Sequence, residues 1–245
     1  MSDPFAVFEG LVNGIIWGKS AGDFRLESPG VQKRYLDAMK RLGIEGGRLI
    51  FPTPNQGTTI GTYGTNNLVQ VDGNAHFWRT REPCDGFLTV VNGAVGVAYM
   101  PADCHIVLLS GTRKGKAMLL ALHCGWRGLV GGILEKGIKL LFELGINCTD
   151  LRALVTPGIG PCCFKVGDEV MDRFKKKFPD ARLHSHTRDG NSQSINMSRV
   201  IREELIGSNI EKFVIMNGCT RCQKDVFWSH RRGDAERNIV AAALA

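Results

Sequence analysis

The chain has 245 residues, 43% of them hydrophobic and 22% charged, which is the composition of a globular protein with a sizeable core and excludes a disordered chain. The formal net charge of +7 is first explained by a solvated basic surface and next by a site for small anions such as phosphate. No basic stripe interleaves with aromatic residues, so no nucleic-acid partner is expected. No apolar segment reaches the roughly 20 residues of a membrane-spanning helix, and the first residues lack a signal-peptide pattern, so we expect no membrane partner and a cytoplasmic location.

Helical and strand-like patterns alternate in the first half of the chain. Val31, Tyr35, Met39 and Leu42 recur at helical spacing and a glycine follows them, which predicts a helix that ends at Leu42. Strand-like runs separated by turn residues follow at residues 48–53, 86–91, 95–100, 106–110 and 116–123. Between the first two of these runs, a stretch rich in Gly, Thr and Asn indicates short strands and turns.

The second half is richer in helical patterns, the clearest of which places Leu134, Ile138 and Leu141 on one face. The predicted elements are helices at residues 129–144, 166–178, 197–206 and 235–244 and strands at residues 151–155 and 213–216. Neither a linker nor a repeat divides the chain. The pattern therefore favours a single α+β domain over residues 1–245, with a mixed or largely antiparallel sheet flanked by helices.

A reactive cluster follows the strand predicted at residues 95–100. The sequence there is Pro-Ala-Asp-Cys-His, so the carboxylate of Asp103, the thiol of Cys104 and the imidazole of His105 stand together at a strand end. Rigid scaffolds present reactive groups at such positions. The structural alternative is a turn with an aspartate cap and a buried cysteine.

A second cluster, His-Cys-Gly-Trp-Arg-Gly, begins at His123, where another strand-like run ends. Its glycines let a ligand approach the backbone, and Arg127 supplies a fork of donors suited to phosphate or carboxylate. Trp126 offers a flat face on which a base can stack. The alternative is a glycine-rich packing turn with a core tryptophan.

The order of the strands brings Cys104 and His123 together. If residues 106–110 pair with residues 116–122 as a hairpin, Cys104 precedes the outgoing strand and His123 follows the returning one, so both stand at one end of the pair. Two chemistries then remain open. The two side chains could ligate zinc with a third group, or His123 could deprotonate Cys104 for nucleophilic attack.

Two later segments contribute candidate residues. Arg231 and Arg232 stand beside aromatic residues, a composition that could hold phosphate and stack a base. Cys219 and Cys222 have the spacing of a metal-ligand pair, but the sequence contains no second pair at similar spacing, so a structural zinc site is not the favoured interpretation.

Taken in order, these segments resemble the purine nucleoside phosphorylase family, once described as polyphenol oxidases or laccase-domain proteins. The family's motifs A-D-C, C-T and F-x-S-x-R-R match residues 102–104, 219–220 and 227–232. Its H-A-G-W-R-G motif matches residues 123–128 with Cys124 in place of Ala, and its G-P-x-I-G-P turn resembles residues 156–161. The resemblance implies a single-domain α+β fold and an enzyme that cleaves purine nucleosides with phosphate and deaminates adenosine. It also implies a zinc ion held by His, Cys and His, of which Cys104 and His123 are the second and third ligands.

The first ligand of the family, in a Q-V-H-G motif, does not carry over. Counting from the first helix points to residues 55–58, and counting back from the A-D-C motif points to residues 70–73, neither of which contains histidine. Asp72 is the expected substitute because a carboxylate can ligate zinc. Gln56 and His76 are the alternatives.

The leading hypothesis is therefore an enzyme for purine nucleosides and phosphate, in which zinc at Cys104 and His123 activates water for deamination. Asp103 would orient a ligand or assist proton transfer. The arginines named above (Arg127, Arg231, Arg232) would hold phosphate. One alternative is a metal-free cysteine hydrolase or deamidase, and another is an inactive relative that binds nucleosides. Copper-dependent phenol oxidation is disfavoured, because it needs several grouped histidines and the six here are scattered.

Overall fold

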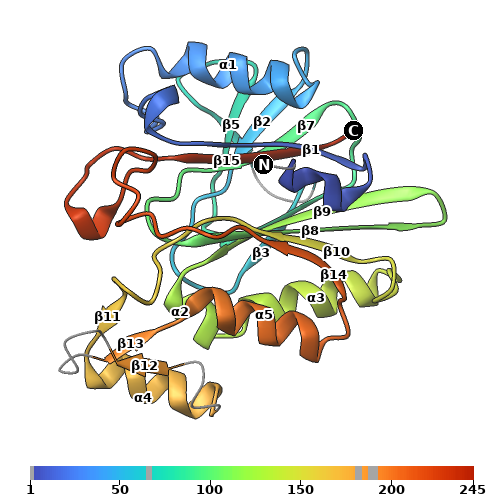
Figure 1. Cartoon of the computed structure of the whole chain (residues 1–245). Helices are drawn as coiled ribbons and strands as arrows, with labels where there is room; N and C mark the ends of the chain where they lie inside the picture. The colour runs from blue at the N-terminus through green and yellow to red at the C-terminus, as the bar shows by residue number, and fades with distance from the viewer. Residues whose placement is uncertain (1–2, 65–67, 180–183, 187–192) are drawn as a thin grey trace.

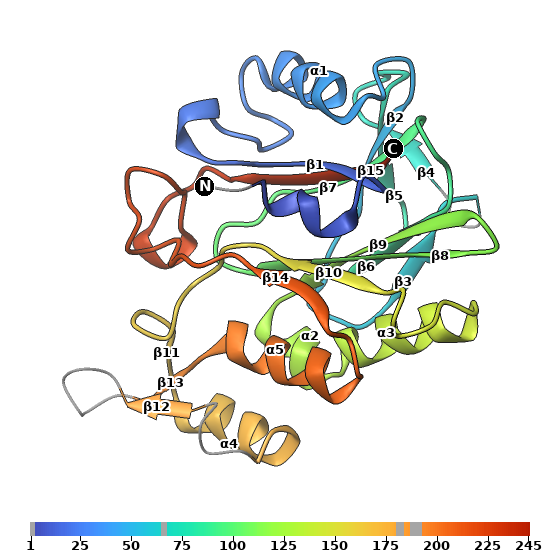
Figure 2. The same cartoon turned by 45° about the vertical axis from the view of Figure 1, so that its right-hand side comes forward.

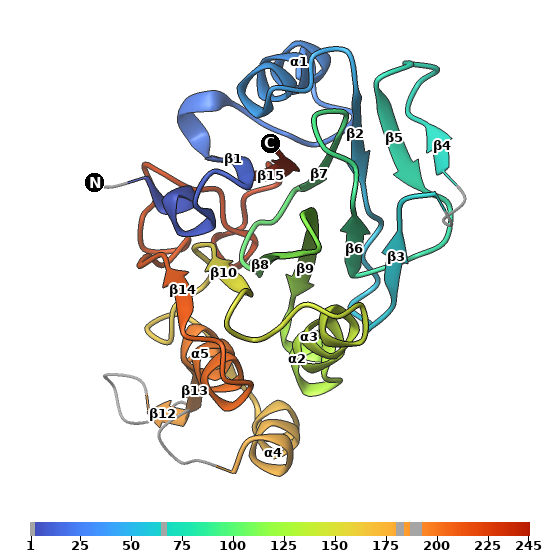
Figure 3. The same ribbon diagram turned by 90° about the vertical axis from the view of Figure 1, so that its right-hand side faces the viewer.

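Two six-stranded sheets lie face to face with helices on both outer sides, in a computed structural model that describes residues 3–64, 68–179, 184–186 and 193–245 (Figure 1). The first sheet has the order β1 (Val12–Trp17), β15 (Ile239–Leu244), β7 (Val95–Tyr99), β2 (Arg48–Phe51), β5 (Phe77–Thr80) and β4 (Leu68–Gln70). The second has the order β14 (Lys212–Ile215), β10 (Arg152–Val155), β8 (His105–Arg113), β9 (Lys116–Cys124), β6 (Gly86–Thr89) and β3 (Ile60–Thr62). Figure 3 shows the two sheets one above the other.

The helices cover the outer faces of the sheets. Helix α1 (Val31–Leu42) packs on the first sheet, and α2 (Trp126–Val130), α3 (Ile133–Glu143) and α5 (Met197–Gly207) pack on the second. Helix α4 (Asp168–Lys177) lies against a small sheet of β11 (Lys165–Val166), β13 (Gln193–Ile195) and β12 (His184–His186), as Figure 2 shows. Short 3-10 segments occur at Pro4–Phe8, Lys19–Ala21 and His230–Arg232.

Along each central strand, successive side chains point alternately into two different hydrophobic cores, one between the sheets and one outside them. In β8, Ile106 and Leu108 face the space between the sheets, whereas Val107 and Leu109 face the helices outside the second sheet. Strands that are buried on both faces consist of continuous apolar runs, which explains why these strands are easy to predict from the sequence. Both sheets mix parallel and antiparallel pairs, so the expected mixed sheet flanked by helices is confirmed.

The helix expected at residues 129–144 is interrupted. Helix α2 begins earlier, at Trp126, and Gly131 and Gly132 separate it from α3. Gly132 has a φ of +85°, a left-handed conformation that glycine adopts without strain and that a continuous helix does not contain. The break lets α2 stay close to the end of β9, where the histidine motif lies.

The helix expected at residues 235–244 is wrong, because the alanine-rich end forms strand β15. This strand lies between β1 and β7, with Ala242 opposite both Gly14 and Val97. Ala242 faces the space between the sheets, and Ala241 and Ala243 face α1. Small side chains fit where layers meet closely on both faces, so strand pairing and packing override the helical propensity of alanine.

Among the described residues, every helix is too short or too polar to cross a membrane.

Replacing Ala242 with leucine tests this placement. The side chain of Ala242 is fully buried between the sheets, so added methylene groups overpack the core, and we expect Ala242→Leu to lower the free energy of unfolding by about 1–3 kcal/mol. Ala235→Leu, at an exposed position just before the strand, is the matched control and should change the midpoint of denaturant unfolding little. Equal midpoints for the two variants would contradict a packed strand.

Candidate active site

The Cys104 thiol and the His123 ring meet at one end of the β8–β9 pair, as the order of the strands predicts. Ile106 of β8 lies opposite His123 of β9 in the antiparallel register. The Cys104 thiol is close enough to the His123 side chain to help raise the pKa of the imidazole. A Cβ atom placed on Gly125 would lie 3.4 Å from both Cys104 Sγ and His123 Cε1, so glycine at this position keeps the space beside both atoms free of a side chain.

Asp85, directly before β6, holds the other side of the His123 ring. His123 Nδ1 lies 3.0 Å from Asp85 Oδ1, and the Asp85 side chain is fully buried. The backbone N–H groups of Asn55, Gln56 and Gly57 donate to the same carboxylate at 3.2, 3.1 and 2.8 Å. Burial alone would raise the pKa of this carboxyl, but the hydrogen bonds from His123 and the backbone outweigh burial and lower it. Asp85 is therefore a buried, ionised carboxylate.

His123 is correspondingly easier to protonate than an ordinary histidine. Burial would lower its pKa, but the hydrogen bonds to Asp85 and Cys104 outweigh burial and raise the pKa to about 9. The ring of Tyr99 stacks on the imidazole, with 6.2 Å between ring centroids and an interplanar angle of 17°. The Tyr99 hydroxyl donates to the backbone oxygen of Asp85, so one buried side chain supports both members of the pair.

Sequence reasoning missed Asp85. The residue stands alone before a strand-like run, with no motif around it, and only the pairing of β6 with β9 brings it beside the histidine. Gly86 lies opposite Leu122 in that pairing, so Asp85 comes next to His123. A prediction that placed the strand at residues 86–91 beside the one at residues 116–123 would have found it.

Cationic side chains line the edge of the site. The guanidinium of Arg127 lies 4.4 Å from the centroid of the Trp126 ring and donates to the side-chain oxygen of Gln56. Lys136 donates to the hydroxyl of Thr58 at 2.6 Å. Arg127 is exposed, so its charge can meet an anion that arrives from solvent.

Asp103, which sequence reasoning placed among the catalytic residues, connects loops. One carboxylate oxygen accepts from the hydroxyls of Thr220 and Ser229 at 2.6 and 2.8 Å, and the other accepts from the backbone N–H of Arg231 at 2.7 Å. The Arg231 guanidinium donates to the backbone oxygen of Lys165 at 2.9 Å. The contacts of Asp103 thus hold the chain after β14 against the strand end that carries the thiol.

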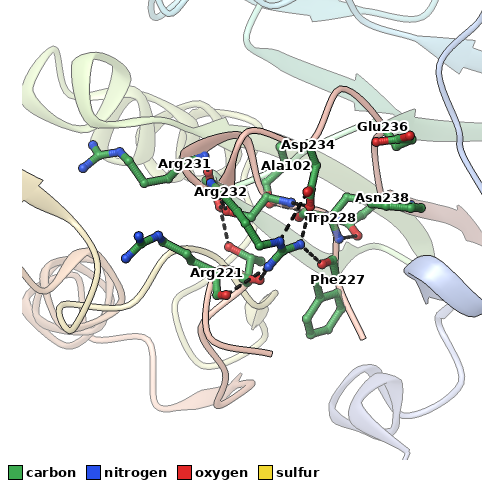
Figure 4. A network of polar contacts seen from close by, with 12 residues as sticks. Ala102, Arg221, Phe227, Trp228, Arg231, Arg232, Asp234, Glu236 and Asn238 are labelled. Carbon is green, nitrogen blue, oxygen red and sulfur yellow. Dashed lines mark hydrogen bonds and ion pairs between the residues drawn. The ribbon is translucent and has the colours of Figure 1, made fainter. Parts of the chain in front are cut away.

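Arg232 lies inside a second network of contacts, shown in Figure 4. Its guanidinium pairs with Asp234 and donates to the backbone oxygens of Thr220, Arg221 and Phe227. Three carbonyl groups and a carboxylate surround the charge, and this arrangement stabilises the loop itself. Of the two adjacent arginines, Arg231 is the exposed one.

His105, next to the thiol in sequence, is directed elsewhere. The ring is buried, and its Nδ1 lies 2.7 Å from the backbone oxygen of Thr156. Burial lowers the pKa of His105, so this imidazole is neutral at neutral pH.

Of the three candidates for the first metal ligand, only Gln56 contacts residues of the site, through Asp85 and Arg127. Asp72 lies in the turn after β4, and His76 lies before β5, where its Nδ1 is 2.9 Å from the backbone oxygen of Gly47. The structure thus places both of these in the connection between β4 and β5, the strands at one edge of the first sheet.

Cys104 and His123 provide two of the three protein ligands that a catalytic zinc requires. Within the described parts of the chain, the only group of three or more His, Cys, Asp or Glu side chains close enough to hold a metal ion consists of Cys162, Cys163, Cys219 and Cys222. An amide such as that of Gln56 is a poor zinc ligand. The donor set around Cys104 therefore does not complete a zinc site.

Comparison with solved structures supports the fold. YlmD from Geobacillus stearothermophilus superposes with a TM-score of 0.76 at 22% identity, covering 97% of this chain and 93% of the other. YfiH from Bacillus licheniformis superposes with a TM-score of 0.74 at 21% identity, covering 91% of this chain and 85% of the other.

Sequence comparison finds relatives with enzyme names. The purine nucleoside phosphorylase of Aquifex aeolicus is 29% identical over 66% of this chain and 72% of its own length, and YfiH of Escherichia coli, with the same enzyme name, is 30% identical over 67% of each chain. Adenosine deaminase RL5, from an unknown prokaryotic organism, is 28% identical over 62% of this chain and 58% of its own. Residues 27–243 match the family described as multi-copper polyphenol oxidoreductase laccase. The chain belongs to this family, which is the laccase-domain family that its motifs resemble.

Proposed function

We propose that this protein is an enzyme that acts on purine nucleosides at the site of Cys104, His123 and Asp85, cleaving them with phosphate and, as a second reaction, deaminating adenosine. The observation that carries the proposal is the His123–Asp85 pair beside the Cys104 thiol, in a chain whose relatives are named purine nucleoside phosphorylase and adenosine deaminase. The paired imidazole is a proton donor and acceptor held in a fixed orientation, which both reactions require.

In phosphorolysis, the imidazolium of His123 would act as the general acid that protonates the leaving purine. With a pKa of about 9, His123 is protonated at neutral pH, and Asp85 stabilises the charge. When the bond between the ribose C1′ and the purine N9 breaks, its electron pair moves to the purine, and His123 transfers its proton to the purine N7. A phosphate oxygen forms the new bond to C1′, and the neutral imidazole then regains a proton from solvent.

Phosphate and base would be held by the edge of the site. Arg127 is exposed and contacts Gln56 and Trp126 among the described residues, so phosphate can replace the amide oxygen as acceptor. Trp126 is half-buried and offers a stacking face for the purine. Arg231 is the second candidate for phosphate, because Arg232 is engaged in its own loop.

Zinc at Cys104 and His123, which the family resemblance implies, is not part of this step. Among the residues that the structure describes, the donor set includes no third protein ligand, so we assign the proton transfer above to His123 alone. The family description names copper, but the site offers one histidine and one cysteine, and multicopper oxidation needs several grouped histidines.

A second candidate function follows from the arrangement of Cys104, His123 and Asp85 in a row. Thiol, imidazole and buried carboxylate form the series in which a histidine activates a cysteine nucleophile and a third group orients the histidine. A metal-free hydrolase or deamidase would use Cys104 for attack, with the proton moving to His123.

The first test is turnover of adenosine and inosine with and without inorganic phosphate. We expect the wild-type protein to release adenine or hypoxanthine together with ribose 1-phosphate. His123→Gln removes the acid, so kcat should fall by about 10²–10⁴-fold. His76→Gln, a histidine outside the site, is the matched control and should leave the rate unchanged.

Each other outcome separates the alternatives. If purified protein turns over neither nucleoside with phosphate, the proposed function is rejected. If it instead hydrolyses amides and iodoacetamide at Cys104 abolishes that reaction, the second candidate is supported. Nucleoside binding without turnover identifies an inactive relative.

The second test concerns the protonation of His123. Asp85→Asn removes the negative charge that raises the pKa of His123 but leaves the ring buried, so the pKa should fall from about 9 towards or below its ordinary value. An NMR titration of the histidine ring protons measures the shift, with the buried ring of His105 as internal control. An unchanged titration of His123 would show that Asp85 does not hold the proton.

A further inference from the structure

Four cysteines other than Cys104 converge on one point. Cys162 and Cys163 lie in the turn before β11, and Cys219 and Cys222 lie in the loop after β14. All four Sγ atoms lie within 4.8 Å of one another, and Cys222 Sγ is 3.5 Å from Cys162 Sγ and 3.4 Å from Cys163 Sγ. In a tetrahedral zinc site with Zn–S bonds of about 2.3 Å, sulfurs are roughly 3.8 Å apart.

We propose that Cys162, Cys163, Cys219 and Cys222 bind a structural zinc ion, which ties the loop before β11 to the loop after β14. The inference is independent of the proposed function, because none of its ligands belongs to the candidate active site. Sequence spacing alone missed this site, because adjacent cysteines are not a usual ligand pair.

The backbone of both loops is arranged to bring the sulfurs together. Cys163 N–H donates to the oxygen of Gly160 at 2.9 Å, and Thr220 N–H donates to the oxygen of Gly158 at 3.0 Å, which joins the loops side by side. A Cβ atom on Gly160 would lie 3.1 Å from the Cys219 Cβ and 3.3 Å from the Cys162 Sγ. Glycine at this position therefore allows the close approach of the two loops.

A cationic donor beside the sulfurs partly compensates the charge that four thiolates and one zinc ion carry. The Arg221 guanidinium lies 3.6 Å from Cys163 Sγ. Such contacts orient metal ligands and stabilise their deprotonated form.

Disulfide bonds explain the arrangement less well. A disulfide joins two sulfurs at about 2.05 Å and places no demand on a third or fourth, whereas all four here share one centre. Cys162 and Cys163 are neighbours in sequence, so pairing them with each other would strain the backbone. A four-thiolate tetrahedron is the donor set of structural zinc.

The zinc ion would stiffen one wall of the active-site region. Thr220, between the two ligands of the second loop, donates to Asp103, which is next to Cys104 in the chain. A metal-tied loop therefore fixes the position of the strand end that carries the thiol. Loss of the metal would release residues 219–223 from the loop before β11.

The test is the metal content of the full chain, purified under reducing conditions, by mass spectrometry. We expect about one zinc per chain in the wild-type protein and in Cys104→Ala, and its loss in Cys222→Ser and in Cys162→Ser. Cys148→Ser, another free cysteine outside the cluster, is the matched control and should keep the zinc. The Cys104→Ala arm makes the result independent of any metal at the candidate active site.

Cobalt substitution of the wild-type protein gives a second readout that requires no variant to fold. Cobalt bound by four thiolates gives intense thiolate-to-metal bands in the near ultraviolet and tetrahedral bands in the visible, and both should survive Cys104→Ala. The proposal is overturned if zinc is lost in Cys104→Ala but kept in Cys222→Ser, if the cluster holds iron, or if thiol titration of the denatured, unreduced protein finds the cluster oxidised to disulfide.

Discussion

A buried carboxylate is the constraint on which the arrangement of the site depends. An ionised carboxylate loses the stabilisation of water when it is buried, so it must receive several hydrogen bonds or become protonated. Asp85 receives three from consecutive backbone N–H groups and one from His123. Gln56 adopts a left-handed φ of +63°. With this local conformation, the three N–H groups all point towards the Asp85 carboxylate. The same interaction thus shapes the loop at residues 55–57, sets the protonated nitrogen of the histidine and raises its pKa.

Periodicity predicted the parts of the fold in which local pattern and tertiary packing agree. Strands β8 and β9 are apolar on both faces because each lies between two cores, so their ends, and with them Cys104 and His123, could be located from the chain alone. Helix α1 has one apolar face and a glycine after it, and its end at Leu42 was predicted. The stacking of two large sheets was not predictable, because an apolar run predicts a buried strand but does not show to which sheet the strand belongs.

The remaining errors share a cause, which is that long-range contact decides what local sequence leaves open. An alanine run favours a helix in isolation but forms a strand where β1 and β7 lie on either side of it. Asp85 has no motif, and only the β6–β9 pairing gives it a partner. The two cysteine pairs are separated by more than fifty residues and by unlike spacings, so neither pair suggests the other. In each case the structure depends on contacts between segments that are distant in the chain, and neither segment alone predicts the contact.

Some charged residues that the motifs predict for the site also make contacts that stabilise the loops around it. Arg231 and Arg232 stand beside aromatic residues, which suits a phosphate site, yet carbonyl groups and Asp234 surround the Arg232 guanidinium. Asp103 lies next to the thiol, yet both its oxygens accept bonds from the chain after β14. Functional residues often lie on loops that a rigid scaffold positions, and Asp103 and Arg232 anchor such loops here. Substitution of these anchors would therefore displace the thiol and the imidazole, and its effect on activity would arise from geometry rather than from a lost acid or base.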